Sequence, residues 1–388
     1  MVEWKKMWEV TTWDKKFSGV EKYMQPKVIK YYYYLANELA DLERLSGDIR
    51  ILYTTNKEAY TNSIDVEGTI SEGEVVTIPW GGNVNIQYYN GKFVTADNRI
   101  ATSNNTDYLN NKFLYYWMLS QKDEIAKMYR GAGIQHPSML SVLSMSIPIP
   151  SLEEQTRIVG ILDTFTSAID NLKEQIAQRR KQYEYYRDQL LDLEGKPGVE
   201  MKTLGEVCKI GDGLHGTPIY NETGDFFFIN GNNLGNGKIL IKSDTKKVDD
   251  TMFSKYGIEL DNKTILMSIN GTIGNIAVYN GEKIILGKSA AYFKIFKDDV
   301  ILYRFLYYSL QTTNSNNYYM ESLTGTTIKN LGLKALRNYY IPLPPLSEQQ
   351  RIVSILETFE ASIQNLEAQL KEREKQYEYY RNKLLTFE

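Results

Sequence analysis

The chain has 388 residues, 42% hydrophobic and 24% charged, a composition typical of globular proteins with two to three domains. A single cysteine, Cys208, excludes an internal disulfide and a cysteine-rich metal site. We find no signal-peptide pattern and no apolar run of about 18 residues, so we expect a cytoplasmic protein with no membrane span. A net charge of −3 argues against general attraction to nucleic acid, so binding would need a local patch or shared phosphate contacts.

Residues 1–146 are predicted to be a mixed α and β domain. Short runs such as GEVVTIP, NIQYY and KFVTA have the β-branched and alternating pattern of strands, and turn residues separate them. A helical stretch is predicted around 107–129. The glycine-rich sequence RGAGIQHPS follows it, and a loop at that place would project from a rigid scaffold, where binding residues often lie.

Residues 147–194 are predicted to form one long helix after a proline motif. Ser151 and Glu154 have the spacing of a capping box, and the prolines upstream cannot continue a helix backward. Apolar positions then alternate by four and three residues, the heptad pattern of a coiled coil, with one arginine that either fixes the register or extends to solvent. The predicted seam comprises Ile158, Leu162, Phe165, Ile169, Leu172, Ile176, Arg179, Tyr183, Tyr186, Leu190 and Leu193.

Residues 195–388 repeat this arrangement. The segment 341–388 matches 147–194 without a gap, and 28 of the 48 paired positions are identical. Ser347 and Gln350 correspond to the first capping box. Residues 195–340 hold the strand-like runs TILMSI, NIAVY, KIIL and AAYFKIF, a helical stretch around 298–311, and the loop sequence TGTTIKN. The second seam comprises Ile352, Leu356, Phe359, Ile363, Leu366, Leu370, Arg373, Tyr377, Tyr380, Leu384 and Phe387.

The duplication predicts the architecture. Two copies of one unit tend to bury the same faces in the same way, so we expect a pseudo-two-fold molecule. The predicted fold class is α+β, with two domains of small, twisted, mainly antiparallel sheets and two long helices that form an intramolecular antiparallel coiled coil. The expected domains are 1–146, 147–194, 195–340 and 341–388. Pairing of the helices with a second chain is the alternative packing.

Evidence for catalysis is weak. The chain has only two histidines, His136 and His215, and no His or Cys cluster at metal-ligand spacing, so we expect no metal site. GDGLHG at 211–216 has the glycine pattern of dinucleotide binding, but Thr217-Pro218 follows where a helix should open. GEKIILGKS at 281–289 has one residue too many for a phosphate loop.

The repeated motifs resemble those of one known family, the specificity subunits of type I restriction–modification systems. The resemblance is carried by IP(I/L)P followed by LxEQxRIVxIL and by QYEYYRxxLL, each present twice behind a variable domain. IGDGLHGTPIYNETGDFFFINGNNL and TGTTIKNL in the second variable domain also look like family motifs. The first variable domain departs from the pattern, with WDKKFSGV in place of DGxHxTP.

The resemblance implies a non-catalytic reader of double-stranded DNA in host defence. Each variable segment would be a target recognition domain for one half of a bipartite site, and the helices would set the half-site spacing. The expected partners are two modification subunits, which methylate adenine, and restriction subunits. No cofactor is expected in this chain, and S-adenosylmethionine, ATP and Mg are expected on the partners. The alternative is a coiled-coil adaptor without sequence-specific DNA binding, which would leave the paired globular segments unexplained.

Candidates for DNA contact are polar residues in the predicted loops, because Arg and Lys pair with guanine and Asn and Gln with adenine. Arg99 could equally form a structural ion pair. In the first domain the candidates are Lys15, Lys16, Trp80, Asn83, Lys92, Arg99, Arg130 and Gln135. In the second domain they are His215, Thr217, Asn230, Asn232, Asn233, Asn270, Lys288, Thr326, Thr327 and Lys329.

Overall fold

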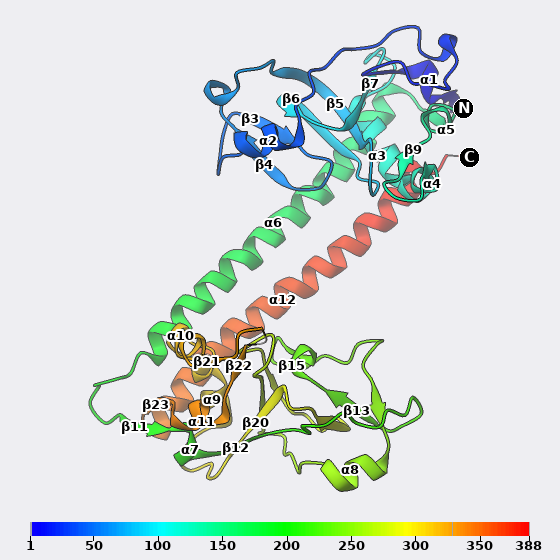
Figure 1. The fold of residues 1–388 in the computed structure, drawn as a ribbon. Helices are drawn as coiled ribbons and strands as arrows, with labels where there is room; N and C mark the ends of the chain where they lie inside the picture. The colour runs from blue at the N-terminus through cyan, green and yellow to red at the C-terminus, as the bar shows by residue number, and fades with distance from the viewer. Residues whose placement is uncertain (1, 328, 388) are drawn as a thin grey trace. The chain divides into compact units, whose positions relative to one another are not determined.

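The computed structural model describes residues 2–327 and 329–387, so Met1, Ile328 and Glu388 of the predicted ranges lie outside the described residues. The chain divides into two compact units. Unit 1 comprises Met1–Lys173 and Gln369–Glu388, and unit 2 comprises Glu174–Ala368. Each unit therefore contains one globular region and a part of both long helices (Figure 1).

The globular part of unit 1 is built on a six-stranded sheet with the order β2-β7-β5-β6-β3-β4. All neighbours are antiparallel except β3 and β6, so the prediction of a mainly antiparallel sheet is confirmed. Its elements are β1 (Glu3–Lys6), α1 (Met7–Val10), β2 (Thr11–Trp13), η1 (Lys22–Met24), α2 (Ala36–Leu42), β3 (Ile49–Leu52), β4 (Glu58–Thr61), η2 (Ser63–Asp65), β5 (Ser71–Pro79), β6 (Gln87–Thr95), β7 (Asn98–Ser103), α3 (Asn111–Ser120), α4 (Lys122–Lys127), β8 (Tyr129–Arg130), β9 (His136–Pro137), α5 (Met139–Leu143) and β10 (Ser146–Ile149).

The globular part of unit 2 divides its strands between two main sheets, with the orders β12-β20-β17-β18 and β16-β13-β19. Its elements are β11 (Glu200–Thr203), α7 (Leu204–Val207), β12 (Cys208–Asp212), β13 (Phe226–Ile229), η3 (Gly231–Asn233), β14 (Leu234–Gly235), β15 (Lys238–Ile239), β16 (Lys247–Val248), α8 (Asp250–Tyr256), β17 (Ile265–Ser268), β18 (Ile276–Val278), β19 (Ile284–Leu286), β20 (Ala290–Ile295), α9 (Tyr303–Ser309), α10 (Thr313–Glu321), β21 (Leu323–Thr324), β22 (Asn330–Leu331), α11 (Leu333–Asn338) and β23 (Tyr340–Leu343).

The internal repeat of the sequence is also a repeat of structure. In unit 1 the first strand β1 pairs antiparallel with β10, so that Trp4 lies opposite Pro148. In unit 2 β11 pairs with β23 in the same register, with Met201 opposite Pro342. A four-residue helix follows each first strand, and a short hairpin and a helix precede each last strand. Both globular parts are thus closed by the same strand pair directly before a long helix.

The two long helices, α6 (Leu152–Leu191) and α12 (Leu346–Leu385), have 40 residues each. At about 1.5 Å per residue each is about 60 Å long. The amide of Glu154 donates to Ser151 Oγ at 3.3 Å, which confirms the N-cap of the first predicted capping box. The Glu154 side chain bonds Arg157. The second cap is wrong, because α12 begins at Leu346 and Ser347 lies inside its first turn.

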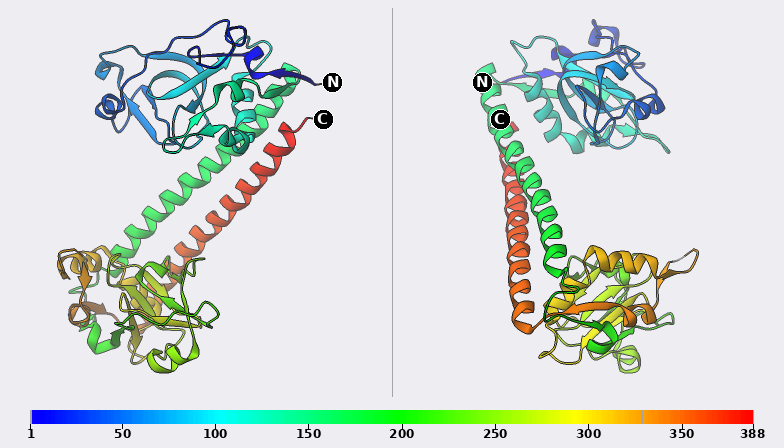
Figure 2. Two further views of the ribbon diagram at one scale, coloured as in Figure 1. Left: turned by 45° about the vertical axis from the view of Figure 1, so that its right-hand side comes forward. Right: turned by 90° about the vertical axis from the view of Figure 1, so that its left-hand side faces the viewer.

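Within each unit the helices run antiparallel and side by side (Figures 1 and 2). In unit 1 Phe165 stacks on Tyr380 with ring centroids 5.3 Å apart. The equivalent pair in unit 2 is Tyr186 and Phe359, at 5.4 Å. The predicted antiparallel pairing inside one chain is therefore confirmed. The Arg179 guanidinium lies 5.9 Å from the centre of the Phe359 ring, and Arg373 is equivalent, 5.7 Å from that of Phe165.

The seam residues differ in burial along the helices. Tyr186 and Tyr380 are 46% and 40% exposed, and Arg373 is exposed as well. Leu193 and Phe387 lie beyond the helix ends and pack against the globular cores instead of the seam. The buried seam residues are Ile158, Leu162, Ile169, Ile176, Ile352 and Leu356. The half-buried ones are Phe165, Leu172, Arg179, Tyr183, Leu190, Phe359, Ile363, Leu366, Leu370, Tyr377 and Leu384.

The hydrophobic cores anchor the ends of the helices. Ile158 and Leu162 of α6 and Leu385 of α12 join the main core of unit 1, together with Phe113 of α3. Ile352 and Leu356 of α12 join the main core of unit 2 in the same way.

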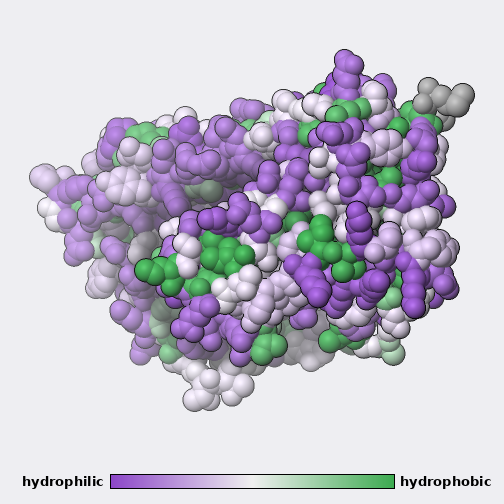
Figure 3. Space-filling model, turned by 90° about the horizontal axis from the view of Figure 1, so that it is seen from above, coloured by the Kyte–Doolittle hydropathy of each residue, from purple (hydrophilic) through white to green (hydrophobic). Residues whose placement is uncertain are grey.

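The face shown in Figure 3 is mostly hydrophilic, and its hydrophobic side chains form small separate groups.

Candidate nucleic-acid interface

Five loops of unit 2 converge through hydrogen bonds of their backbone amides, carbonyls and one serine hydroxyl. The amide of Lys288 donates to the carbonyl of Leu214 at 2.9 Å, which joins the loop after β12 to the turn between β19 and β20. The amide of Gly231 donates to Ser289 Oγ at 2.9 Å, which adds the loop after β13. Asn270, after β17, pairs with Asn330 at the base of the β21–β22 hairpin. Loops distant in sequence therefore form one continuous surface.

Two glycines make this convergence possible. A Cβ added to Gly213 would lie 1.9 Å from the carbonyl oxygen of Leu286, and one added to Gly287 would lie 2.3 Å from Asn230 Oδ1. The neighbour of Gly213 is a backbone carbonyl that cannot turn aside, so this position needs glycine, whereas a side chain at Gly287 would displace the Asn230 side chain. Within the 211–216 pattern, Gly213 thus serves loop packing, and the dinucleotide interpretation is not needed to explain this glycine.

The convergent loops carry most of the residues predicted for unit 2. His215 is exposed, and its Nε2 lies 2.8 Å from Asp212 Oδ2. Asn270 Nδ2 donates to the carbonyl of Lys288 at 3.3 Å. Thr217, Asn232, Lys288, Thr326, Thr327 and Lys329 are exposed, while Asn230 and Asn270 are half-buried. The exposed lysines and side-chain amides give this surface N–H groups that can donate hydrogen bonds to phosphates and base edges.

Asn233 is a correction within this group. It is only 6% exposed. Its Nδ2 donates to the carbonyl of Leu240 and to Thr245 Oγ1, both at 3.1 Å. Its Oδ1 accepts from the amide of Asn230 at 3.1 Å. These bonds use its polar atoms inside the protein, so Asn233 shapes the loop and is not available to a ligand.

A second, smaller cluster in unit 1 surrounds Trp80, at the end of β5. Lys15 Nζ lies 5.7 Å from the centre of the Trp80 ring, and the His136 ring centroid is 5.2 Å from that of Trp80. The amide of Gly82 donates to the carbonyl of Gln135 at 3.0 Å, which joins the β5–β6 loop to the β8–β9 hairpin. Burial, together with the charge of Arg99, lowers the pKa of Lys15. Three exposed candidates border this cluster. Lys16 follows Lys15 in the sequence, and Asn83 and Gln135 lie in the two loops that the Gly82 bond joins.

Arg99 is the main correction in unit 1. It is 4% exposed and forms an ion pair of 2.8 Å with Asp14, which is 3% exposed. Its guanidinium also lies 4.8 Å from the centre of the Trp80 ring. The structural ion pair, which the sequence left open as an alternative, therefore explains this residue.

Two other candidates of unit 1, Lys92 and Arg130, lie outside the Trp80 cluster or at its border. Lys92 lies opposite Glu72 in the β5–β6 ribbon, away from the loop that connects these strands. Arg130 is exposed at the base of the β8–β9 hairpin, opposite His136. Arg130 thus borders the Trp80 cluster, whereas Lys92 does not belong to it.

The structure adds residues that the sequence analysis did not select. His136 belongs to the Trp80 cluster, since its Nδ1 lies 2.7 Å from the carbonyl oxygen of Trp80. In unit 2 Lys242 Nζ donates to the carbonyl of Asn232 at 3.0 Å. Lys246 lies with Asn230 and Asn232 around a cavity of about 140 Å³. The closely spaced lysines of KSDTKK, residues 242–247, could have indicated these two contacts from the sequence. The same spacing is typical of any solvent-exposed loop.

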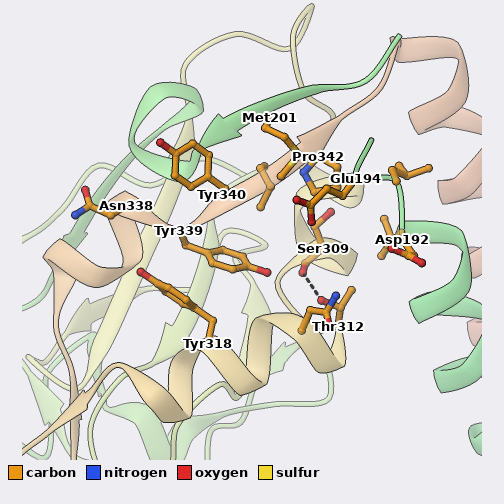
Figure 4. Close-up of a pocket in the computed structure, with 14 residues that line it drawn as sticks. Asp192, Glu194, Met201, Ser309, Thr312, Tyr318, Asn338, Tyr339, Tyr340 and Pro342 are labelled. Carbon is orange, nitrogen blue, oxygen red and sulfur yellow. Dashed lines mark hydrogen bonds between the residues drawn. The ribbon is translucent and has the colours of Figure 1, made fainter. Parts of the chain in front are cut away.

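A pocket of about 480 Å³ in unit 2 has a different character (Figure 4). Tyr318, Tyr339 and Tyr340 line it, and Asp192 and Glu194 lie at its other side. Its described lining includes no lysine or arginine. Carboxylates without a basic partner repel phosphate, so this pocket does not extend the nucleic-acid interface.

Among residues 2–327 and 329–387, none of the helices combines the length and the hydrophobicity of a membrane span. No group of three or more His, Cys, Asp or Glu side chains in these two ranges is arranged to hold a metal ion. The single cysteine, Cys208, is buried, and burial raises its pKa to about 12. A thiol with so high a pKa is a poor nucleophile at neutral pH.

The fold defines a protein with two loop-bearing domains carried by one repeated helical frame. The sequence matches the family of type I restriction modification DNA specificity domains over residues 27–179 and 197–374. The chain belongs to this family.

Similar proteins agree with this assignment. The chain is 30% identical over 370 residues to a candidate type I restriction enzyme specificity subunit of Haemophilus influenzae, covering 89% of each chain. It is 30% identical over 294 residues to the EcoR124I/EcoR124II specificity subunit of Escherichia coli, covering 71% of this chain and 70% of the other. The crystal structure of the S subunit of the type I restriction-modification system of M. genitalium has the same fold, with a TM-score of 0.60, 18% identity and coverage of 100% and 97%.

Lys288 provides a test of the unit 2 interface. We expect Lys288→Ala to relax discrimination at one base pair of the target by about tenfold, because we predict that this exposed lysine donates to a base edge. Binding to duplexes with single base changes measures this. The control is Lys255→Ala on α8, an exposed lysine outside the loops. Equal weakening on every sequence would instead make Lys288 a phosphate contact.

Proposed function

We propose that this chain is the DNA sequence-specificity subunit of a type I restriction–modification complex and recognises a bipartite site. The globular regions 1–146 and 195–340 act as target recognition domains, one for each half-site, and the helices set the spacing. The observation that carries the proposal is the duplicated frame. The same strand register and the same helix motif support two loop clusters of different sequence.

The charge distribution supports a shared interface with DNA. Residues 195–340 carry 17 lysines and arginines against 14 acidic residues, whereas 1–146 carry 16 against 17. Such a small excess does not hold a duplex by itself, because affinity for DNA depends on many phosphate contacts. Partner subunits that supply further phosphate contacts explain this balance.

The proposal includes the partners of the chain. Two modification subunits bring S-adenosylmethionine and methylate adenine, and restriction subunits use ATP and Mg. The chain itself is non-catalytic and acts in the cytoplasm. An adaptor without DNA binding is disfavoured, because the family match extends over both globular regions as well as the helices.

Methylome sequencing tests the function directly. We expect a host that expresses this chain with its modification subunit to gain a bipartite methyladenine motif with a gap of fixed length. The control host expresses the modification subunit alone and should lack that motif. A stable complex that produces no new motif would contradict the proposal of an active specificity subunit.

A further inference from the structure

A buried glutamine bonds the start of α6 to the globular part of unit 1. Gln155 is 0% exposed. Its Oε1 accepts from the amide of Asn110 at 2.8 Å. Its Nε2 donates to the carbonyl of Tyr108 at 2.9 Å and to that of Pro150 at 3.0 Å. One side chain thus joins the first turn of α6, the proline motif and the residues before α3.

Unit 2 has the same arrangement. Gln349 in the first turn of α12 is also 0% exposed. Its Oε1 accepts from the amide of Leu302 at 2.9 Å. Its Nε2 donates to the carbonyl of Val300 at 3.0 Å and to that of Pro344 at 2.9 Å. The two glutamines therefore make the same three bonds to equivalent places in domains whose loops differ.

These contacts require glutamine in particular. Each site presents one amide and two carbonyls, so it needs an acceptor and two donors on one planar group. An ionised glutamate has no donor, and an apolar side chain would leave all three backbone groups without the bonds that the glutamine makes. Asparagine has the right groups but is shorter by one methylene.

Ion pairs and tyrosine hydrogen bonds further along each helix reinforce the junction. In unit 1 Lys112 and Tyr116 of α3 both contact Asp163, at 2.8 and 2.6 Å. In unit 2 Arg304 of α9 contacts Glu357 at 3.1 Å, and Tyr308 donates to Glu360 at 2.9 Å. The glutamine fixes the start of each helix, and these pairs fix the next two turns.

We propose that Gln155 and Gln349 are positioning residues that hold each recognition domain at one orientation on its helix, so that the complex accepts one spacer length. This inference rests on the proposed function. A helix of fixed length specifies a fixed half-site separation only when the domain at its end cannot rotate. The glutamines contact no DNA, so they act through the junction.

The test uses Gln155→Met and Gln349→Met, which retain the volume of the side chain but not its hydrogen bonds. Each variant is assembled with the modification subunits and bound to duplexes whose spacers are one base pair shorter, unchanged or one base pair longer. We expect preference for the unchanged spacer to fall by about tenfold, which corresponds to ~1.4 kcal/mol, because the domain can reorient. Discrimination among bases within each half-site should remain.

Glu154→Gln and Glu348→Gln are the matched controls. Each breaks an ion pair in the same helical turn, Glu154 with Arg157 and Glu348 with Arg351, on the exposed side. Both controls should keep the wild-type spacer preference, because exposed pairs contribute little. Unchanged spacer preference in the methionine variants would overturn the proposal, as would an equal loss of base discrimination.

Hydrogen exchange keeps the inference testable without DNA. We expect slow exchange of the Asn110 and Leu302 amides in the unmodified complex. Exchange should become faster at Asn110 alone in Gln155→Met and at Leu302 alone in Gln349→Met. Fast exchange of both amides in the unmodified complex would contradict the hydrogen bonds of Gln155 and Gln349 to these amides. Protected amides in a complex that binds no specific DNA would instead overturn the proposed function and the spacer role together.

Discussion

Removal of one heptad from both long helices is expected to shorten the preferred spacer of the DNA site and to leave both half-sites unchanged. The change deletes residues 172–178 from α6 and the equivalent residues 366–372 from α12. Seven residues of helix span about 10.5 Å, which corresponds to roughly two to three base pairs of duplex, depending on the tilt of the helices. Methylome sequencing of the variant measures the spacer and both half-sites together.

The deletion is matched because the two helices pair antiparallel along one seam. A seven-residue change keeps the four-and-three spacing of the remaining seam residues, so the same faces stay in contact. The deletion also removes Glu367 and with it the ion pair to Arg180, but this pair is largely exposed and contributes little to stability.

A control deletes the same heptad from α6 only. The two helices then differ in length, the seam is mismatched, and we expect weaker modification without a new fixed spacer. If the matched variant modified DNA with the original spacer, the helices would not set the half-site separation.

Loss of Asp14 is expected to destabilise unit 1 by about 3–5 kcal/mol, because it leaves the buried Arg99 guanidinium without a counter-charge. Three groups converge on the Asp14 carboxylate. Arg99 Nη1 lies 2.8 Å from Oδ2, Tyr33 donates its hydroxyl to Oδ2 at 2.8 Å, and the amide of Ile100 donates to Oδ1 at 3.0 Å. Burial, together with the charge and hydrogen bond of Asp14, raises the pKa of Tyr33 well above its ordinary value.

The measurement is the unfolding of Asp14→Leu followed by tryptophan fluorescence. All five tryptophans of the chain lie within residues 1–146, so this signal reports unit 1. The double variant Asp14→Leu with Arg99→Met should recover most of the stability, because neither charge remains buried alone. Retained stability in Asp14→Leu would show that Arg99 reaches solvent and would restore it as a candidate for DNA contact.

The sequence predicted the helical frame well because its information is local. Heptad spacing, the proline motif and the cap at Ser151 depend on residues within a few turns of each other. The strands over TILMSI, NIAVY and AAYFKIF were also recognisable from their β-branched and apolar runs, and they form β17, β18 and β20. The cap at Ser347 was wrong because α12 begins at Leu346, two residues before the start that a cap at Ser347 implies. Pro345 holds the cap position, and its carbonyl accepts from the amides of Glu348 and Gln349.

Burial of polar residues was not predictable in the same way. Arg99 and Asn233 belong to residue types that contact DNA, yet both are buried in the structure. Arg99 pairs with Asp14, and Asn233 bonds Leu240 and Thr245 on the far side of a turn. Asp14 lies 85 residues from Arg99. No local pattern distinguishes such an arginine from an exposed one, so only the fold decided between contact and ion pair.

The sequence by itself determined the duplicated frame and, through its resemblance, the family, because 28 identical positions of 48 and the heptad seams are properties of residue order. The tertiary structure alone decided which loops meet. Gly213 allows close approach to the backbone of Leu286, 73 residues away, and Gln155 and Gln349 bond to carbonyls more than 40 residues away. Those contacts depend on non-local packing, which the order of residues does not reveal.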